Sequence, residues 1–437
     1  MRAICARLSV PIESTASSYG TKSPQESQTN RIVGVSHLYF KPARRLFCIY
    51  NVKVRSGQKK IAVLQKYFSA LLLLLVGCTQ AYSPTAMRSA PVAPASPPQP
   101  VVDYIPIVQL QGDPQSIGQQ YGEKLGPTMR LLLNKYLLVT LSGSELLQAR
   151  LAAVGFEMQM LPEHREEIAA LAQSAGVNPI DVALAQCFLD LTSVEACSTI
   201  TLGPEAAPDH IARFGRNLDF PSLNVIDKYT TVLIYHPTGK YQFASIGWPG
   251  MIGVLSGMNE WGLTISNMEV DRTARPPVAM PYTLLYRAVL ENCRTVDEAI
   301  AFLQNTPRQS ANNLMLMDAA GNRAVAEITP DGVTVRRGSL GSALISTNHQ
   351  RGQDTDTPGY CWRYDSLHAD AAAHFGSIDQ SELHAMLSKV IQGNNGDMTL
   401  QSMIFEPTNR IIYLAAGSNA PTHPYQRIDL KEYFGAK

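Results

Sequence analysis

The chain is organised around the stretch Glu195-Ala-Cys-Ser-Thr-Ile-Thr-Leu202, a turn with Pro and Gly, and Arg213-Phe-Gly-Arg-Asn-Leu-Asp-Phe220. A free cysteine is mostly protonated at neutral pH, so the Cys197 thiol needs a base before it becomes a nucleophile. The stretch supplies Arg216 to stabilise a thiolate and Asp219 to orient a base, but no histidine. If the chain is cut between Ala196 and Cys197, the new α-amine is that base, because its reference pKa of about 7.7–8 suits proton transfer near neutrality.

The same residues are also compatible with roles outside catalysis. A lone Cys197 is more often a small buried hydrophobe, and Arg216 with Asp219 is compatible with a surface ion pair. In a regular strand, residues three apart face opposite sides. Arg216 and Asp219 therefore meet at one site only if the strand ends or bends near Asn217. The position of Cys197, where a helical pattern gives way to strand patterns, favours the catalytic reading.

Further motifs follow in order: Gly215-Arg-Asn-Leu-Asp219, Gly257-Met-Asn-Glu-x-Gly-Leu-Thr264 and Thr347-Asn-His349. With Cys197, they make residues 103–437 resemble the aminopenicillanic acid acyltransferase family of N-terminal-nucleophile (Ntn) hydrolases. Bile-salt hydrolases, penicillin V acylases and acid ceramidase share the pattern more loosely. The resemblance implies that Asp219 contacts the new amine and the thiol, and that Arg216 supports the nucleophile.

Acyl transfer also needs hydrogen-bond donors for the oxyanion. Asn348, after an apolar strand, is the first candidate, although an Asn at a strand end is commonly a turn residue. Asn267 is the second, and the choice between Asn267 and Glu269 stays open. Arg363 matches an Arg of the ceramidase-like relatives, where it serves the site or substrate, and a structural ion pair is the alternative. His349, next to Asn348 on a strand, points the other way and is interpreted as structural or as part of the site's rim.

Trp248-Pro-Gly-Met-Ile252 fits either an apolar acyl pocket or ordinary core. The sequence holds no HExxH, no P-loop and no dinucleotide-binding Gly motif, so we expect no metal and no cofactor.

Charge is distributed unevenly. Residues 1–77 hold 12 Lys and Arg against 2 Asp and Glu, whereas residues 78–437 hold 25 against 34. An acidic body argues against nucleic acid as a partner. The 7 cysteines form no CxxC pair and no zinc pattern, and their odd number suits separate roles better than a disulfide framework.

The N-terminal hundred residues read as an export segment. Residues 1–60 are an extension, either foreign to the mature protein or disordered. Residues 61–78 carry a basic stretch, an apolar run too short to span a bilayer, and Leu75-Val-Gly-Cys78, which resembles a bacterial lipobox. A core helix with a buried Cys78 is the alternative. Residues 79–101 form a Pro-rich linker. We therefore expect a lipid anchor at Cys78 and a place in the bacterial envelope, on the periplasmic face of the outer membrane.

Residues 102–196 begin with a strand at 102–110 and continue with helical patterns, one of them broken near Pro127. Residues 197–437 alternate between groups of strands and pairs of helices, including a capping box at Thr295 and Glu298. We expect an α+β fold, the four-layer αββα arrangement of Ntn hydrolases preceded by a mostly helical pro-segment. The cut separates this pro-segment from the catalytic unit 197–437.

Together these observations predict a self-cleaving cysteine amide hydrolase or acyltransferase. It forms a thioester at Cys197 with a small-molecule amide or acyl donor. A narrower enzyme reading is a bile-salt or penicillin V acylase, and a reading of another class is a non-enzymatic envelope lipoprotein that keeps the fold. Self-cleavage discriminates this last reading from the others.

Overall fold

The computed structural model describes residues 104–141, 143–192, 196–270, 279–352, 361–393 and 397–435. They all belong to one compact unit, Ser96–Lys437. The predicted segments 1–60, 61–78 and 79–101, with the lipidation site Cys78, lie outside the described residues, so these predictions stay predictions.

The part before Cys197 is mostly helical, as the sequence predicts. It consists of β1 (Ile107–Gly112), α2 (Pro114–Leu132), the π-helical turn η1 (Leu133–Leu137), α3 (Leu138–Thr140), α4 (Ser144–Glu157), α5 (Pro162–Ala175) and α6 (Pro179–Leu191). The start of α2 follows from local chemistry: the side chain of Asp113 accepts a hydrogen bond from the backbone N–H of Ser116 at 2.8 Å, and Pro114 occupies the first turn, where a missing N–H costs little.

The expected break near Pro127 is wrong, because α2 continues through it to Leu132. Tertiary packing explains the continuity. A Cβ atom at Gly118 or Gly122 would lie 2.3 Å from the Glu167 carbonyl or 2.6 Å from Ser174, so only glycine lets α2 approach α5 this closely. This contact holds the helix across the one backbone hydrogen bond that Pro127 cannot donate.

The remainder alternates between strands and helices. The strands are β2 (Ala196–Leu202), β3 (Arg213–Pro221), β4 (Thr231–Pro237), β5 (Phe243–Gly247), β6 (Ser256–Asn259), β7 (Thr264–Glu269), β8 (Asn312–Met317), β9 (Arg323–Ile328), β10 (Val333–Arg337), β11 (Leu344–Ser346), β12 (Asp397–Glu406), β13 (Ile411–Ala416) and β14 (Gln426–Asp429). The helices are η2 (Pro204–Ala206), η3 (Ile226–Lys228), α7 (Tyr282–Asn292), α8 (Val296–Asn305), α9 (Trp362–His374), α10 (Gln380–Lys389), η4 (Ala420–Thr422) and α11 (Lys431–Phe434). Thr295 caps α8 by accepting from the Glu298 N–H, as its motif predicts.

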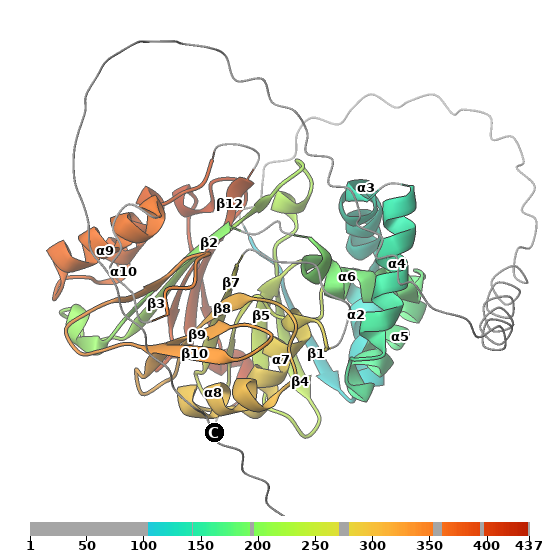
Figure 1. The fold of residues 1–437 in the computed structure, drawn as a ribbon, viewed down its shortest axis with the longest axis horizontal. Helices are drawn as coiled ribbons and strands as arrows, with labels where there is room; N and C mark the ends of the chain where they lie inside the picture. Colours follow the sequence, from blue (N-terminus) through green and yellow to red (C-terminus); the bar gives the residue numbers. More distant parts are fainter. Residues whose placement is uncertain are drawn as a thin grey trace, which may run out of the picture. The chain divides into compact units, whose positions relative to one another are not determined.

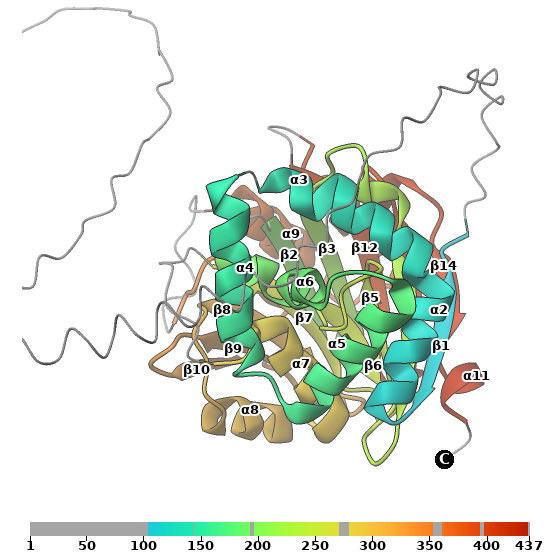
Figure 2. The ribbon, with the colours of Figure 1, turned by 90° about the vertical axis from the view of Figure 1, so that its right-hand side faces the viewer.

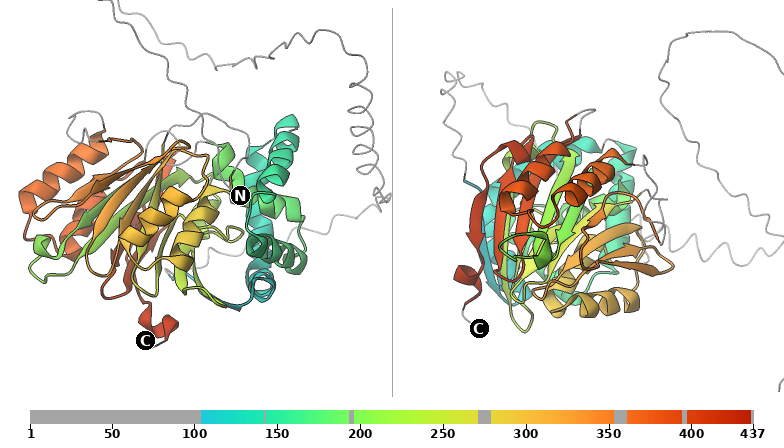
Figure 3. Two further views of the ribbon diagram at one scale, coloured as in Figure 1. Left: turned by 60° about the horizontal axis from the view of Figure 1, so that its bottom comes forward. Right: turned by 90° about the vertical axis from the view of Figure 1, so that its left-hand side faces the viewer.

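The strands form two stacked sheets. The larger has the order β1-β4-β5-β6-β7-β8-β9-β10 and the smaller β11-β2-β3-β12-β13-β14. Helices α9 and α10 cover the outer face of the smaller sheet, whereas α7 and α8 cover the larger one (Figures 1 and 3). Between the sheets lies the main apolar core. The expected four layers in an α+β fold are therefore present.

The register of β2 and β3 determines what surrounds Cys197. Cys197 lies opposite Leu218, Ala196 opposite Asp219, and Thr199 opposite Arg216. Strand β3 neither ends nor bends at Asn217, so the condition for Arg216 and Asp219 to converge is not met. Alternation instead places Arg216 on the face between the sheets and Asp219 on the face toward α9.

The helical part and the catalytic part share a sheet. Strand β1 pairs in parallel with β4, and α2, α4 and α5 lie together in front of the strands in Figure 2. Among the described helices, none is long and apolar enough alone to cross a membrane; the bent pair Pro114–Thr140 and Ser144–Glu157 meets that test together.

Candidate active site

Cys197 lies near the start of β2 and is fully buried. Its backbone N–H donates to Oδ1 of Asn348 at 2.7 Å, and its carbonyl oxygen accepts from Nη1 of Arg363 at 2.7 Å. The backbone N–H and C=O of Cys197 are thus both hydrogen-bonded to side chains from distant parts of the chain. A free α-amine formed at the Cys197 nitrogen would remain beside Oδ1 of Asn348.

Arg363 connects the site residues. It projects from the first turn of α9, and its Nη1 donates to Oδ2 of Asp219 at 3.0 Å while Nη2 donates to Oδ1 of Asn348 at 3.0 Å. The ion pair is buried, with 7% of the Arg363 side chain and 0% of the Asp219 side chain exposed. Thr399 donates to the other carboxylate oxygen of Asp219 at 2.5 Å. The paired charges satisfy one another, as burial requires.

Asn348 is fixed from two directions. Its Nδ2 donates to the carbonyl oxygen of Glu269 at 2.8 Å. The flanking carbonyl groups of Thr347 and His349 both accept from Nδ2 of Asn313, at 2.9 and 2.8 Å. Asn313 lies on β8 and is fully buried. No sequence motif pointed to Asn313, because its partners lie far along the chain, in the loop that follows β11 of the other sheet.

The Arg216 side chain lies on the opposite face of the smaller sheet, between the two sheets. Its Nε donates to the Ser256 hydroxyl at 3.1 Å, and its Nη1 donates to the Asn267 carbonyl. The side chain is fully buried, and Nη2 has no hydrogen-bond partner among the described residues. A buried donor left this way favours a negative group on the same face. That face also holds the Cys197 side chain.

Asn267 and Glu269 meet the site through their backbone carbonyls. Arg216 binds the carbonyl of Asn267, and Asn348 binds that of Glu269. Ser266 faces the other sheet with its neighbour Ser256, so alternation turns the Asn267 side chain toward the layer of α7. The role of the Asn267 amide as an oxyanion donor therefore stays a prediction.

His349 is half-buried at the rim, where the sequence analysis placed it. Burial, together with the charges of Arg363 and Arg351, lowers the pKa of its imidazole. The residue is therefore neutral at neutral pH.

An apolar pocket opens beside the site. Its walls come from η1, α6, the end of β3 and the loop after β5, with the residues Leu132, Leu133, Tyr136, Leu137, Ala185, Phe188, Leu189, Phe220, Ile226, Trp248, Pro249, Gly250 and Met251. The cavity volume of this pocket is about 70 Å³. Phe220 lies two residues beyond Leu218, the cross-strand neighbour of Cys197, and therefore on the same face as Cys197. Trp248 lines this pocket and is almost fully buried, so its motif contributes both to a pocket wall and to the core.

Side chains of the helical segment hold the pocket loop. Tyr121 accepts from the N–H of Gly250 at 2.9 Å, and Gln186 donates to the Gly250 carbonyl at 2.7 Å and accepts from the Ile252 N–H at 2.8 Å. The pocket consequently depends on residues from both sides of Cys197.

Other reactive groups are sparse in the described part of the chain. The cysteines described there, Cys187, Cys197, Cys293 and Cys361, form no disulfide with one another. Within the same residues, no group of three or more His, Cys, Asp or Glu side chains is placed to hold a metal ion.

The chain is similar to several known proteins. Protein dcd1B of Dictyostelium discoideum is 25% identical over 173 residues, which are 39% of this chain and 34% of that protein. The chain spans less than half the length of the curated relatives it matches. Among solved structures, the N-acylethanolamine-hydrolyzing acid amidase ortholog of Caenorhabditis elegans is 19% identical, with a TM-score of 0.39 over 48% of this chain and 93% of that chain. A variant of the conjugated bile acid hydrolase of Clostridium perfringens is 18% identical, with a TM-score of 0.42 over 55% and 95%.

The model of one protein family matches residues 207–421, a range that contains Arg216, Asp219, Asn348 and Arg363 and begins ten residues after Cys197. This region of the chain therefore belongs to the acyl-coenzyme A:6-aminopenicillanic acid acyl-transferase family.

Proposed function

We propose that the protein is a self-cleaving cysteine amide hydrolase or acyltransferase that acts on amides of apolar acyl groups. Membership of residues 207–421 in an acyl-transferase family indicates acyl transfer as the chemistry. The observation that carries the finer proposal is that two side chains bind the backbone of Cys197. Its N–H donates to Asn348 at 2.7 Å, and its carbonyl oxygen accepts from Arg363 at 2.7 Å. Buried backbone groups always need partners, but here the partners are the side chains of two residues that the motifs also assign to the site.

The first stage is cleavage. The Cys197 thiol adds to the Ala196 carbonyl carbon, the Ala196–Cys197 C–N bond breaks, and the acyl group moves from nitrogen to sulfur. Water then hydrolyses this thioester, which leaves a carboxylate on Ala196 and a free amine on Cys197. Asp219, the cross-strand neighbour of Ala196, supports this step by its position next to the bond that breaks.

The second stage is turnover. The Cys197 amine takes the thiol proton, the thiolate attacks the substrate amide, and the leaving amine departs with a proton from the α-ammonium group. A thioester at Cys197 remains, and water or an acceptor amine releases the acyl group. Arg216 supports the thiolate with its buried guanidinium, and Asn348 is the candidate donor for the oxyanion.

The pocket supports the choice of acyl group. Its lining is almost wholly apolar and contains aromatic side chains from Tyr136, Phe220 and Trp248, which pack on one another with centroid distances of 6.1 and 5.2 Å. An uncharged aliphatic or aromatic acyl group fits this lining, whereas a strongly charged one would lose its hydration without compensation.

We also propose that Cys78 carries a lipid anchor and that the protein lies in the bacterial envelope, on the periplasmic face of the outer membrane. The support is the basic–apolar–Leu-Val-Gly-Cys order in residues 61–78 and the Pro-rich stretch after it.

One experiment tests both cuts: N-terminal sequencing and intact mass of the purified full chain. We expect one chain whose N-terminus is a lipidated Cys78 and a second that begins with Cys197. Cys197→Ala should remain one chain and be inactive, and Cys197→Ser should be cleaved slowly or not at all, because a hydroxyl is a weaker nucleophile. An active enzyme with an intact Ala196–Cys197 bond would refute the amine-base mechanism. An uncleaved and inactive wild-type chain would favour a binding protein that keeps the fold.

A further inference from the structure

Helix α4 carries apolar residues on both of its faces. Ala149, Ala153 and Phe156 are buried against the rest of the helical segment. The opposite face, which we term the α4 outer face, presents Leu147, Leu151, Val154 and Met158, with exposed fractions of 61%, 62%, 42% and 73%. A helix that is apolar all round is normally covered all round.

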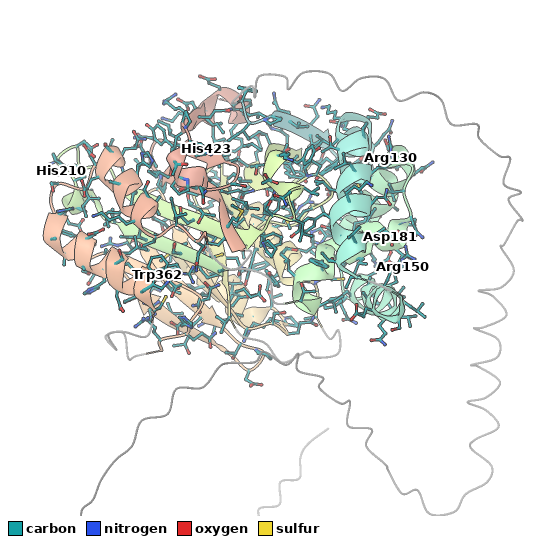
Figure 4. All side chains as sticks on the ribbon, turned by 90° about the horizontal axis from the view of Figure 1, so that it is seen from above. Arg130, Arg150, Asp181, His210, Trp362 and His423 are labelled. Carbon is teal, nitrogen blue, oxygen red and sulfur yellow. The ribbon has the colours of Figure 1, made fainter. Side chains whose placement is uncertain are left out.

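The residues of the α4 outer face form one continuous stripe. Their spacings of four, three and four residues bring them onto one side of a helix with 3.6 residues per turn. Arg150 borders the stripe and pairs with Asp181 on α6 at 2.7 Å, at the outer edge of the helical segment in Figure 4. The stripe therefore faces away from the sheets and has no polar interruption.

The same helical hairpin forms part of the acyl pocket. Leu133 and Leu137 line the pocket from η1, while Leu131 and Val139, on the neighbouring turns, are 38% and 64% exposed. Exposed apolar side chains therefore flank the turn of helix that forms the pocket wall, with Lys135 exposed between them. An apolar ligand bound at this surface would lie close to the pocket wall.

We propose that the α4 outer face rests in the surface of a lipid leaflet, so that apolar amides reach the pocket from the membrane. Two observations favour lipid over a protein partner. The stripe is a single convex row of aliphatic side chains without the aromatic and Arg residues that dominate protein interfaces. Cys78 and Tyr104 are 26 positions apart in the sequence, and even fully extended this stretch reaches at most about 90 Å, so the proposed anchor limits how far the helical segment can lie from the leaflet. Delivery of substrate rests on the proposed function; attachment does not.

Vesicle flotation tests the attachment. The chain that begins at Thr79, which lacks both the anchor cysteine and the apolar run of residues 61–78, is mixed with vesicles of phosphatidylethanolamine and phosphatidylglycerol and centrifuged through a density gradient. We expect the protein to float with the vesicles, also at high salt, because apolar burial is not screened. Adding Leu151→Glu and Met158→Glu should reduce the floating fraction about tenfold or more, since each places a charge where lipid is expected. The matched control is Leu340→Glu at an exposed leucine outside the stripe, 87% exposed, which should float like its parent.

A parent that stays at the bottom of the gradient overturns the proposal, as does equal flotation of all three proteins. A change of solution mass from dimer to monomer in the Leu151→Glu, Met158→Glu variant, without vesicle binding by the parent, assigns the face to a second copy instead. Hydrolysis of a short, water-soluble amide separates this result from the proposed function. We expect that rate to be unchanged in the variant, whereas loss of it in every protein counts against the enzyme and leaves the flotation result standing.

Discussion

Single residues hold the site in place from a distance. Asn313 donates from one amide nitrogen to the two carbonyls that flank Asn348, and it belongs to the other sheet. Asn348 in turn accepts from the Cys197 nitrogen. Any shift of the loop that carries Asn348 therefore moves the partner of the proposed catalytic amine, and a misplacement of about 1 Å can cost about 100-fold in rate.

Replacing Asn313 tests this positioning role. Asn313→Leu keeps the volume and removes both donors, so kcat should fall by about 10- to 100-fold with KM nearly unchanged. The free energy of unfolding should fall by about 1–3 kcal/mol, because two buried carbonyls lose a partner. Steady-state kinetics and denaturant titration measure the two effects.

Asn259 provides the matched control. It also donates to two carbonyls, those of Leu290 and Cys293, and is equally buried. Asn259→Leu should destabilise the protein at least as much and leave kcat near the wild-type value. If both variants lose the same activity, Asn313 has only a structural role.

At the scale of a few residues, the sequence predicted the members of the site better than their arrangement. Cys197, Asp219, Asn348 and Arg363 do meet, because motif order reflects the strands that carry them. The opposite faces of Arg216 and Asp219 follow from alternation once β3 is seen to run straight. The role of Asn313 depends on how two sheets stack, which has no local sequence signal.

The helical segment is joined to the catalytic elements by a buried ion pair. Arg287 on α7 binds Glu167 on α5 through both terminal nitrogens, at 2.9 and 2.7 Å, and its Nε binds Glu291 at 2.8 Å. The guanidinium also lies 4.7 Å from the centre of the Tyr235 ring. If the chain is cut before Cys197, this pair connects two separate chains.

Breaking that pair should separate the chains. Arg287→Met leaves Glu167 and Glu291 buried without a cation, so we expect a loss of about 3–5 kcal/mol in the free energy of unfolding. A tag on the chain before Cys197 should then no longer recover the second chain. The comparable change in the partly exposed pair of Arg150 and Asp181, Arg150→Met, should cost at most about 1 kcal/mol and leave recovery intact. Equal effects at both sites would contradict the proposed role of Arg287.

Element boundaries followed local chemistry wherever local chemistry acted alone. Thr295 caps α8 at the position that its motif predicts. Long-range packing decided the exception: the contact of the glycines of α2 with α5 overrides the break expected at Pro127.

The stability of the whole molecule should depend on pH through His164. This histidine is fully buried on α5, and neither ring nitrogen has a hydrogen-bond partner among the described residues. Burial, and then the charges of Arg287 and Lys240, hold the pKa of His164 well below its usual value. The unfolded chain therefore binds a proton below about pH 6.5 that the folded protein does not accept.

The sign follows from this difference. The free energy of unfolding should decrease as the pH falls below about 6.5, by up to about 1.4 kcal/mol per pH unit from this one group. His164→Leu removes this pH dependence. The free energy of unfolding of the variant, relative to that of the wild type, should therefore increase as the pH is lowered from 7.5 to 5.5. The raised pKa of Glu167, caused first by burial, acts in the opposite direction but is present in both proteins and cancels in the comparison. Denaturant titrations of both proteins at the two pH values measure the difference. Equal losses of unfolding free energy in the wild type and the variant would contradict the role of His164.

The parallel pairing of β1 with β4 has a consequence for the aggregation of a processed protein. Strand β4 reads Thr231-Val-Leu-Ile-Tyr-His-Pro237, and among the described residues the edge of β4 away from β5 is covered only by β1, which precedes Cys197. Without that cover, a long apolar edge with neither Lys nor an internal Pro would be open to the same edge of another molecule. Loss of the helical chain should therefore lead to insoluble assemblies built on β4, so the segment before Cys197 would protect this edge of the sheet for as long as it stays bound.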